Sequence, residues 1–174
     1  MKPLQDQIAQ YASYHRDTRN IATHFVGIPM IVLAIVTLLS RPAFDVAGLP
    51  VTAALVAAVA AGIYYLRLDA RLGIVMSALL ALTLVFGHWI AGMATPVWIA
   101  VGVALFVVGW IFQFIGHAWE GRKPAFVDDL MGLIIGPLFV VVEASFALGL
   151  LRELRRQVED RVGPSRVGGR SAVQ

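Results

Sequence analysis

Long apolar stretches constrain the fold of this chain more than any other feature of its sequence. A helix needs about 20 apolar residues to cross the hydrocarbon core of a bilayer. Four stretches meet or approach that length, and they cover residues 23–39, 51–66, 72–93 and 97–117. Proline, glycine or charged residues separate them, which favours short connections between antiparallel helices. We therefore predict an all-α protein, a polytopic transmembrane helical bundle with four crossings.

The composition agrees with a chain embedded in a membrane. Hydrophobic residues make up 59% of the 174 residues, charged residues only 14%, and the mean hydropathy is +0.77. An ordinary soluble domain is about 45–50% apolar. The length and the continuous apolar stretches leave room for a single domain, which we place at residues 1–155.

Positive charges orient the predicted bundle, because Lys and Arg in short loops stay on the cytoplasmic side. The loop around Pro96 carries no charge, whereas the N-terminus and the loops after the second and fourth stretches are basic. Their basic residues are Lys2, Arg16, Arg19, Arg67, Arg71, Arg122 and Lys123. We expect a multi-pass protein with a cytoplasmic N-terminus, in the inner membrane if bacterial and in the endoplasmic reticulum if eukaryotic. The pI of 9.7 reflects these loops and the tail, so nucleic-acid binding is not expected.

A fifth apolar stretch, residues 130–151, does not fit this alternation, because basic residues flank both of its ends. Gly132, Gly136 and Pro137 weaken its first half as a helix, and Glu143 lies in its middle. A broken or re-entrant helix and a plain fifth crossing are both compatible with these features. After it, residues 156–174 are expected to form a basic, disordered tail.

The segment before the first stretch, residues 4–15, has the pattern of an amphipathic helix that lies in the membrane interface. At about 100° per residue, one stripe of this helix contains Leu4, Ile8, Tyr11 and His15. Just beyond it, Asp17 followed by Thr18 offers good N-cap residues for a new helix. A break at this point would let His15 fold back towards His24.

Two polar helix faces are predicted at the same membrane depth, at the cytoplasmic ends of the first and fourth stretches. Residues three or four apart share a face of a helix. The first face holds Asn20 and His24, and the second holds Gln113, His117 and Glu120. With His15, these groups form a candidate site for a divalent metal. Because the chain has no cysteine, the ligands must be nitrogen and oxygen, which iron and zinc both accept.

Amides and carboxylates inside a membrane bundle are costly unless they are paired, so Gln113 and Glu120 favour a functional site around His117. His88 is predicted on the opposite, outer side, and Glu143 stands alone. We interpret both as structural. Beyond His117, the pair Arg122 and Lys123 either anchors the inner end of the helix or receives a carboxylate headgroup.

Two motifs resemble a known family. They are YHRDTRNIATHFVGIP at residues 14–29 and WIFQFIGHAWEGRKPAF at residues 110–126, the latter followed by DLMGLIIGP. Both are similar to the 2-hydroxy-palmitic acid dioxygenase-like membrane proteins, and the resemblance extends from about residue 4 to residue 154. It implies an iron(II)-dependent dioxygenase of fatty-acid α-oxidation, which uses dioxygen to shorten a 2-hydroxy fatty acid by one carbon.

The resemblance also implies roles for individual side chains, because three of the four histidines fall within the two motifs and His88 does not. Fe(2+) would be bound by His15, His24 and His117, with Glu120 as a further ligand or as a partner that fixes an imidazole. Gln113 and Asn20 would orient the ligands or dioxygen, and Arg122 or Lys123 would steer the carboxylate of the substrate.

Two other functions compete with this interpretation. One is a non-catalytic membrane bundle or a small transporter, although the sequence lacks the internal repeat that is usual in transporters. The other is a zinc-dependent membrane hydrolase in which Glu120 acts as general base. The absence of a His-Glu-x-x-His pair counts against the hydrolase.

Overall fold

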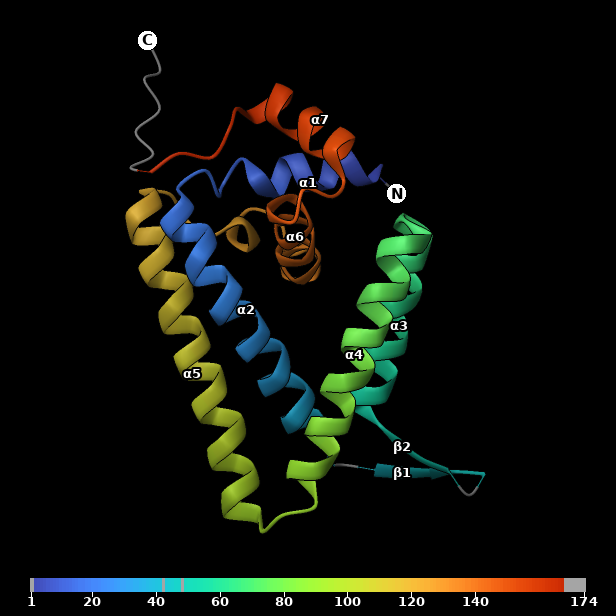
Figure 1. Cartoon of the computed structure of the whole chain (residues 1–174). Coiled ribbons are helices and arrows are strands. Elements are labelled where there is room, and N and C mark those ends of the chain that lie inside the picture. The colour runs from blue at the N-terminus through green and yellow to red at the C-terminus, as the bar shows by residue number, and fades with distance from the viewer. Residues whose placement is uncertain (1, 42, 48, 168–174) are drawn as a thin grey trace. The chain divides into compact units, whose positions relative to one another are not determined.

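The computed structural model describes residues 2–41, 43–47 and 49–167, and over these residues the chain is almost entirely helical (Figure 1). The α-helices are α1 Leu4–Ala12, α2 Thr18–Leu39, α3 Ala53–Leu68, α4 Ala70–Ala91, α5 Thr95–Glu120, α6 Gly132–Ala147 and α7 Arg152–Val162. A 3-10 helix, η1, covers Ala125–Val127, and the strands β1 Ala43–Val46 and β2 Leu49–Thr52 form an antiparallel hairpin. The predicted all-α class is confirmed, whereas the small hairpin was not predicted.

Three helices in the described part of the chain, α2, α4 and α5, are long and apolar enough to cross a membrane. The bent pair of α6 and α7 adds a fourth candidate if it counts as one span. Helix α3 is apolar but has 16 residues, which corresponds to about 24 Å and is short of the ~30 Å hydrocarbon core. The chain is thus a multi-pass membrane protein, and the predicted four crossings hold approximately.

The fifth apolar stretch forms a broken element. Helix α6 ends at Ala147, and the chain bends by 111° into α7. Gly149 has a φ of +74° at this bend, a conformation that glycine adopts without steric cost. The structure differs from the expected disordered tail at residues 156–162, which lie in α7, where Val158 is 2% exposed. Residues 168–174 of that expected tail lie outside the described residues.

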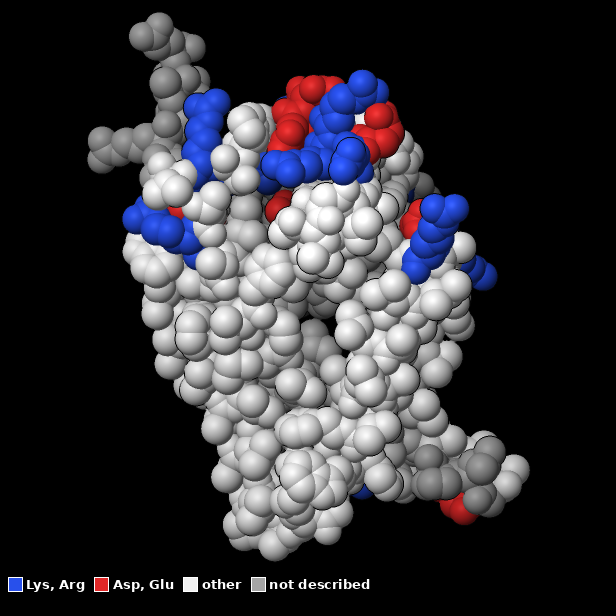
Figure 2. Space-filling view, in the orientation of Figure 1, with Lys and Arg blue, Asp and Glu red and all other residues white. Residues whose placement is uncertain are grey.

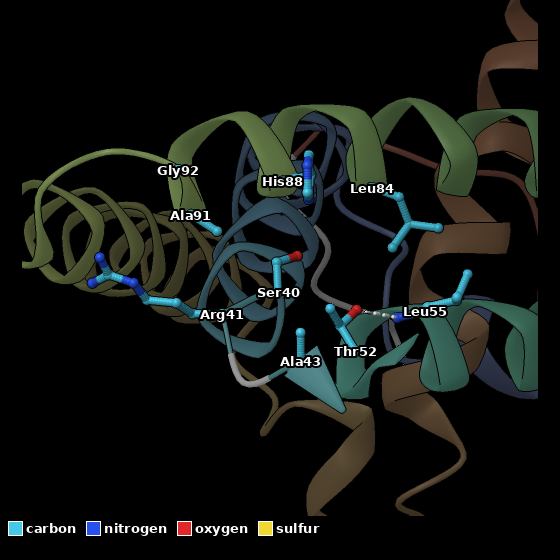
Figure 3. A pocket seen from close by; sticks show the side chains of 9 residues that line it. All are labelled: Ser40, Arg41, Ala43, Thr52, Leu55, Leu84, His88, Ala91 and Gly92. Carbon is cyan, nitrogen blue, oxygen red and sulfur yellow. Dashed lines mark hydrogen bonds between the residues drawn. The ribbon is translucent and has the colours of Figure 1, made fainter. Parts of the chain in front are cut away.

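The chain divides into two compact units. One combines the residues up to Ile28 with those from Trp110 onward, and the other covers Pro29–Gly109. In the second unit, Asp69 separates α3 from α4 and accepts a hydrogen bond from the Leu72 backbone N–H at 2.8 Å, which caps α4. His88 lies in this unit, on the wall of a pocket of about 330 Å³ that Ser40 and Thr52 also line (Figure 3).

The first unit is built around α1, which packs against α6 and α7 (Figure 1). Ile8 and Ala12 on α1 are fully buried, as are Phe139 and Val142 on α6. Charged side chains of this unit gather over α7 and the neighbouring segments (Figure 2). Helix α5 is apolar along its length and carries a charged residue only at its C-terminal end, Glu120. The apolar stripe predicted for residues 4–15 is therefore covered by protein along α1.

Candidate metal centre

A short break between α1 and α2 places His15 at the centre of the first unit. Helix α1 ends at Ala12 rather than at residue 15, so His15 lies in the break. Asp17 precedes the first residue of α2, and its Oδ1 accepts the backbone N–H of Arg19 at 2.9 Å. This is the N-cap predicted from the sequence, and the chain changes direction there between the two helices (Figure 1).

His15, His24 and His117 come together and are all buried, at 0%, 1% and 6% exposure. Each offers one ring nitrogen, and the three nitrogens lie within 4.8 Å of one another. The ring centroids are 4.4 Å apart for His15 and His24, 4.9 Å for His15 and His117, and 5.1 Å for His24 and His117. The sequence predicted this convergence from three separate segments.

The hydrogen bonds of His15 and His24 define which nitrogen of each ring carries a proton. Nδ1 of His15 lies 2.7 Å from the Tyr11 carbonyl oxygen, and Nδ1 of His24 lies 2.9 Å from the Asn20 carbonyl oxygen. A carbonyl oxygen only accepts, so both Nδ1 atoms are donors. In neutral rings this leaves a lone pair on each Nε2, and the two Nε2 atoms lie 3.0 Å apart. Two lone pairs at this distance repel each other, and a cation bound between them would relieve that repulsion.

The ring of His15 is held in a mainly apolar environment. It stacks on Tyr11 with 4.3 Å between the ring centroids and an interplanar angle of 7°, and Phe139 lies 5.5 Å away. Burial, and to a smaller extent the neighbouring histidines, hold the pKa of His15 well below its usual range. His15 is therefore neutral near pH 7, which is the protonation state that binds metals.

Buried polar atoms without a partner concentrate at this site. Four such side-chain atoms occur among the described residues, and three of them are His117 Nδ1, Gln113 Nε2 and Asn20 Oδ1. An unpaired buried polar group costs about 1–3 kcal/mol. The unpaired Nδ1 of His117 has either a lone pair or a proton to offer, and with the lone pair it can serve as a ligand atom. Two ligands about 2 Å from one ion stand about 3 Å apart, as the Nε2 atoms of His15 and His24 do. The residues present therefore fit a metal ion.

Glu120 fixes the break rather than joining the three ring nitrogens. Its carboxylate accepts the backbone N–H of Arg16 at 2.9 and 3.0 Å, the backbone N–H of Asp17 at 2.9 Å and the Asn20 amide at 2.9 Å. The carbonyl of the same Asn20 orients His24. Glu120 thus links the end of α5 to the segment that carries His15 and to a group that holds His24.

Gly116 allows α5 to approach α2 closely enough for His117 to join the other two histidines. A Cβ atom at this position would overlap the Thr23 hydroxyl and the Asn20 side chain. Thr23 and Asn20 lie on the face of α2 that also carries His24. The sequence contained this signal, a glycine directly before His117, but sequence reasoning did not use it.

The other predicted residues lie on α5 and on the segment that directly follows it. Gln113 is buried on α5, one turn before His117. Arg122 and Lys123 are exposed, and neither belongs to the buried cluster. The Arg122 guanidinium donates to the Ser13 carbonyl at 2.6 Å, and Lys123 forms an ion pair with Asp128 at 2.6 Å.

The sequence as a whole matches a known family. Residues 1–148 match the family described as 2-hydroxy-palmitic acid dioxygenase Mpo1-like. The chain belongs to this family. A curated relative, the 2-hydroxy-palmitic acid dioxygenase MPO1 of Saccharomyces cerevisiae, is 30% identical over 158 residues, which cover 90% of this chain and 87% of the relative. No solved structure matches this Mpo1-like chain.

Proposed function

We propose that this Mpo1-like chain is an iron(II)-dependent dioxygenase that shortens 2-hydroxy fatty acids by one carbon. The observation that carries the proposal is the pair of Nε2 atoms on His15 and His24, 3.0 Å apart, with His117 beside them. Three neutral imidazoles without a sulfur ligand suit a first-row divalent metal such as iron(II). The family and the named activity of the yeast relative support the substrate class.

The proposed reaction balances without a further reductant. A 2-hydroxy acid and dioxygen give the acid that is one carbon shorter, carbon dioxide and water. Iron(II), when bound, supplies the one-electron chemistry that activates dioxygen. The chain supplies the three imidazoles that hold the metal and an apolar bundle that excludes water from the reacting groups.

Glu120, Asn20 and Gln113 are proposed to have different roles in the site. Glu120 keeps the break in place and, through Asn20, holds the His24 ring in its ligand orientation. The Gln113 amide has an unpaired buried Nε2 that can donate to the substrate or to dioxygen. Because Glu120 already accepts from three residues, it is poorly placed to act as the general base of a zinc hydrolase.

Recognition of the substrate carboxylate is assigned to Arg122 or Lys123. Both are exposed on the segment that directly follows His117 and Glu120. Arg122 contacts the Ser13 carbonyl and the Tyr14 ring, and Lys123 contacts the exposed carboxylate of Asp128. Exposed contacts of this kind contribute little stability. A substrate carboxylate can displace such partners, while its alkyl chain remains among the apolar helices.

The metal centre is proposed to face the cytoplasm. Arg16 and Arg19 lie beside His15, and Arg122 and Lys123 follow His117, so the end of the bundle that carries the site is basic. Basic residues at membrane helix ends are retained on the cytoplasmic side. The protein is therefore assigned to the inner membrane in a bacterium and to the endoplasmic reticulum in a eukaryote.

Oxygen uptake combined with product analysis tests this function. The detergent-purified protein is loaded anaerobically with iron(II) and given either 2-hydroxypalmitic acid or palmitic acid, which lacks only the hydroxyl group. We expect oxygen uptake and an equimolar amount of the shortened acid with the hydroxy acid alone. Absence of uptake by the iron-loaded protein, or product formed under strict anaerobiosis, would exclude a dioxygenase.

A further inference from the structure

The last described residues lie outside the part that matches the family model, yet they contact the residues that directly follow His15. The family match stops at residue 148, whereas α7 begins at Arg152. After α7, residues 163–166, here named the C-terminal strap, lie along the break between α1 and α2. Arg166 pairs with Asp17 in a parallel β-bridge.

Three hydrogen bonds connect the C-terminal strap to the residues that follow His15. The Arg166 backbone N–H donates to the Arg16 carbonyl at 2.8 Å, and the Thr18 backbone N–H donates to the Arg166 carbonyl at 3.0 Å. The Arg16 guanidinium donates through Nη1 to the Gly163 carbonyl at 2.5 Å. The strap therefore holds the backbone on both sides of Asp17.

Arg16 carries this connection to His15 itself. Its Nε donates to the carbonyl oxygens of Ala12 at 2.8 Å and His15 at 3.1 Å, while its Nη1 reaches the strap. No ion pair of Arg16 occurs among the described residues. The guanidinium thus donates to three backbone carbonyls. The ammonium group of lysine has all its donors on one nitrogen, so it cannot replace a guanidinium that donates from two separate nitrogens.

Helix α7 fixes the other end of the strap. Val158 of α7 is buried, and Arg161 forms an ion pair with Asp6 of α1 at 2.5 Å. Figure 1 shows α7 lying along α1. The His15 segment is therefore held between α1, which precedes it, and the strap, which α7 ties back onto α1.

We propose that the C-terminal strap is a positioning element that holds His15 in the metal centre through Arg16. This inference rests on the proposed function in one respect, namely that the three histidines bind a metal. A ligand that is already held in place loses less conformational entropy when the metal binds, and groups that orient ligands typically change metal affinity by about 10–100-fold. The strap should therefore affect metal affinity more than the stability of the metal-free fold.

Two truncations test the strap directly, with cobalt(II) as the probe metal because its absorption spectrum reports the coordinating ligands. A chain that ends at Val162 keeps α7 and loses all three strap bonds, whereas a chain that ends at Val167 keeps them. We expect the shorter chain to bind cobalt(II) about 10–100-fold more weakly, with a spectrum like that of His15→Ala. The longer chain should match the full-length protein in affinity and spectrum.

Side-chain variants test the link through Arg16. We expect Arg16→Lys to resemble Arg16→Ala, because both lose the guanidinium that joins the three carbonyls. Arg156→Lys is the matched control, since Arg156 is exposed on α7 and pairs with Glu153 rather than with the strap. It should leave cobalt(II) affinity unchanged.

The outcomes separate this inference from the proposed function. If the chain ending at Val162 binds cobalt(II) with full affinity and an unchanged spectrum, the strap has no positioning role. A general loss of stability would also exclude a positioning role. In that case the shorter chain would bind cobalt(II) more weakly and unfold at a lower temperature without metal, but its spectrum would match that of the full-length chain. If the full-length chain itself fails to bind cobalt(II), the metal centre is wrong and both proposals fall.

Discussion

The Nε2 atoms of His15 and His24 lie 3.0 Å apart, and each ring uses its Nδ1–H to bind a backbone carbonyl of the preceding helical turn. These carbonyls fix the rings before any metal arrives. The lone pairs of the two Nε2 atoms then face each other, and both side chains are buried from water. A cation relieves this repulsion, and the free Nδ1 of His117 offers a third ligand.

The metal-free protein should lose stability as the pH falls below about 6.5, the ordinary pKa of histidine. Burial holds the pKa of His15 well below that value in the folded chain. The unfolded chain therefore takes up a proton that the folded chain does not, and stability decreases with decreasing pH. Thermal unfolding between pH 7.5 and 5.5 measures this slope. His15→Gln should reduce this slope, and an unchanged slope in that variant would show that His15 is not buried in its neutral form.

Replacing Glu120 by glutamine should weaken metal binding although it removes no ligand. One acceptor oxygen becomes an NH₂ group that faces the backbone N–H groups of Arg16 and Asp17. We expect metal affinity to fall by about 10–100-fold and the unfolding temperature to decrease. Glu153→Gln on the exposed face of α7 is the control. Equal affinities for both variants would show that Glu120 has no role in the site.

Gly116→Ala should disturb the site by steric overlap alone. The added methyl group would press against Thr23 and Asn20 and force α5 away from α2. Overpacking of this kind costs about 1–3 kcal/mol, and His117 should leave the cluster, so the bound metal should be lost. Gly92→Ala is the matched control, because the nearest atom to its new Cβ is 3.4 Å away. Metal content and thermal unfolding of the two variants provide the comparison.

Much of the site followed from sequence because its signals are local. The N-cap at Asp17 predicted the break, and the helical spacing of Asn20 and His24 predicted their shared face. The three histidines were expected to converge, and the structure brings them together. Their role as ligands remains a prediction.

The remainder depends on contacts between segments far apart in the chain. The carboxylate of Glu120 accepts a hydrogen bond from the backbone N–H of Arg16, which lies 104 residues away in the sequence. No local pattern of side chains predicts a hydrogen bond between such distant residues. Helix α7 was missed because a single residue, Val158, is buried on it. Its pairs of opposite charge, such as Arg155 and Glu159, were the available signal. The bonds of the C-terminal strap are largely made by backbone atoms and leave almost no trace in the sequence.

Metal analysis of the purified protein shows whether the three histidines form a metal centre. We expect the wild-type chain and His88→Ala each to retain a single iron ion per chain after anaerobic loading and desalting. Under the same conditions His15→Ala, His24→Ala and His117→Ala should lose it while remaining folded. Iron absent from the wild type, or retained unchanged in His24→Ala and His117→Ala, would contradict the three-histidine metal centre.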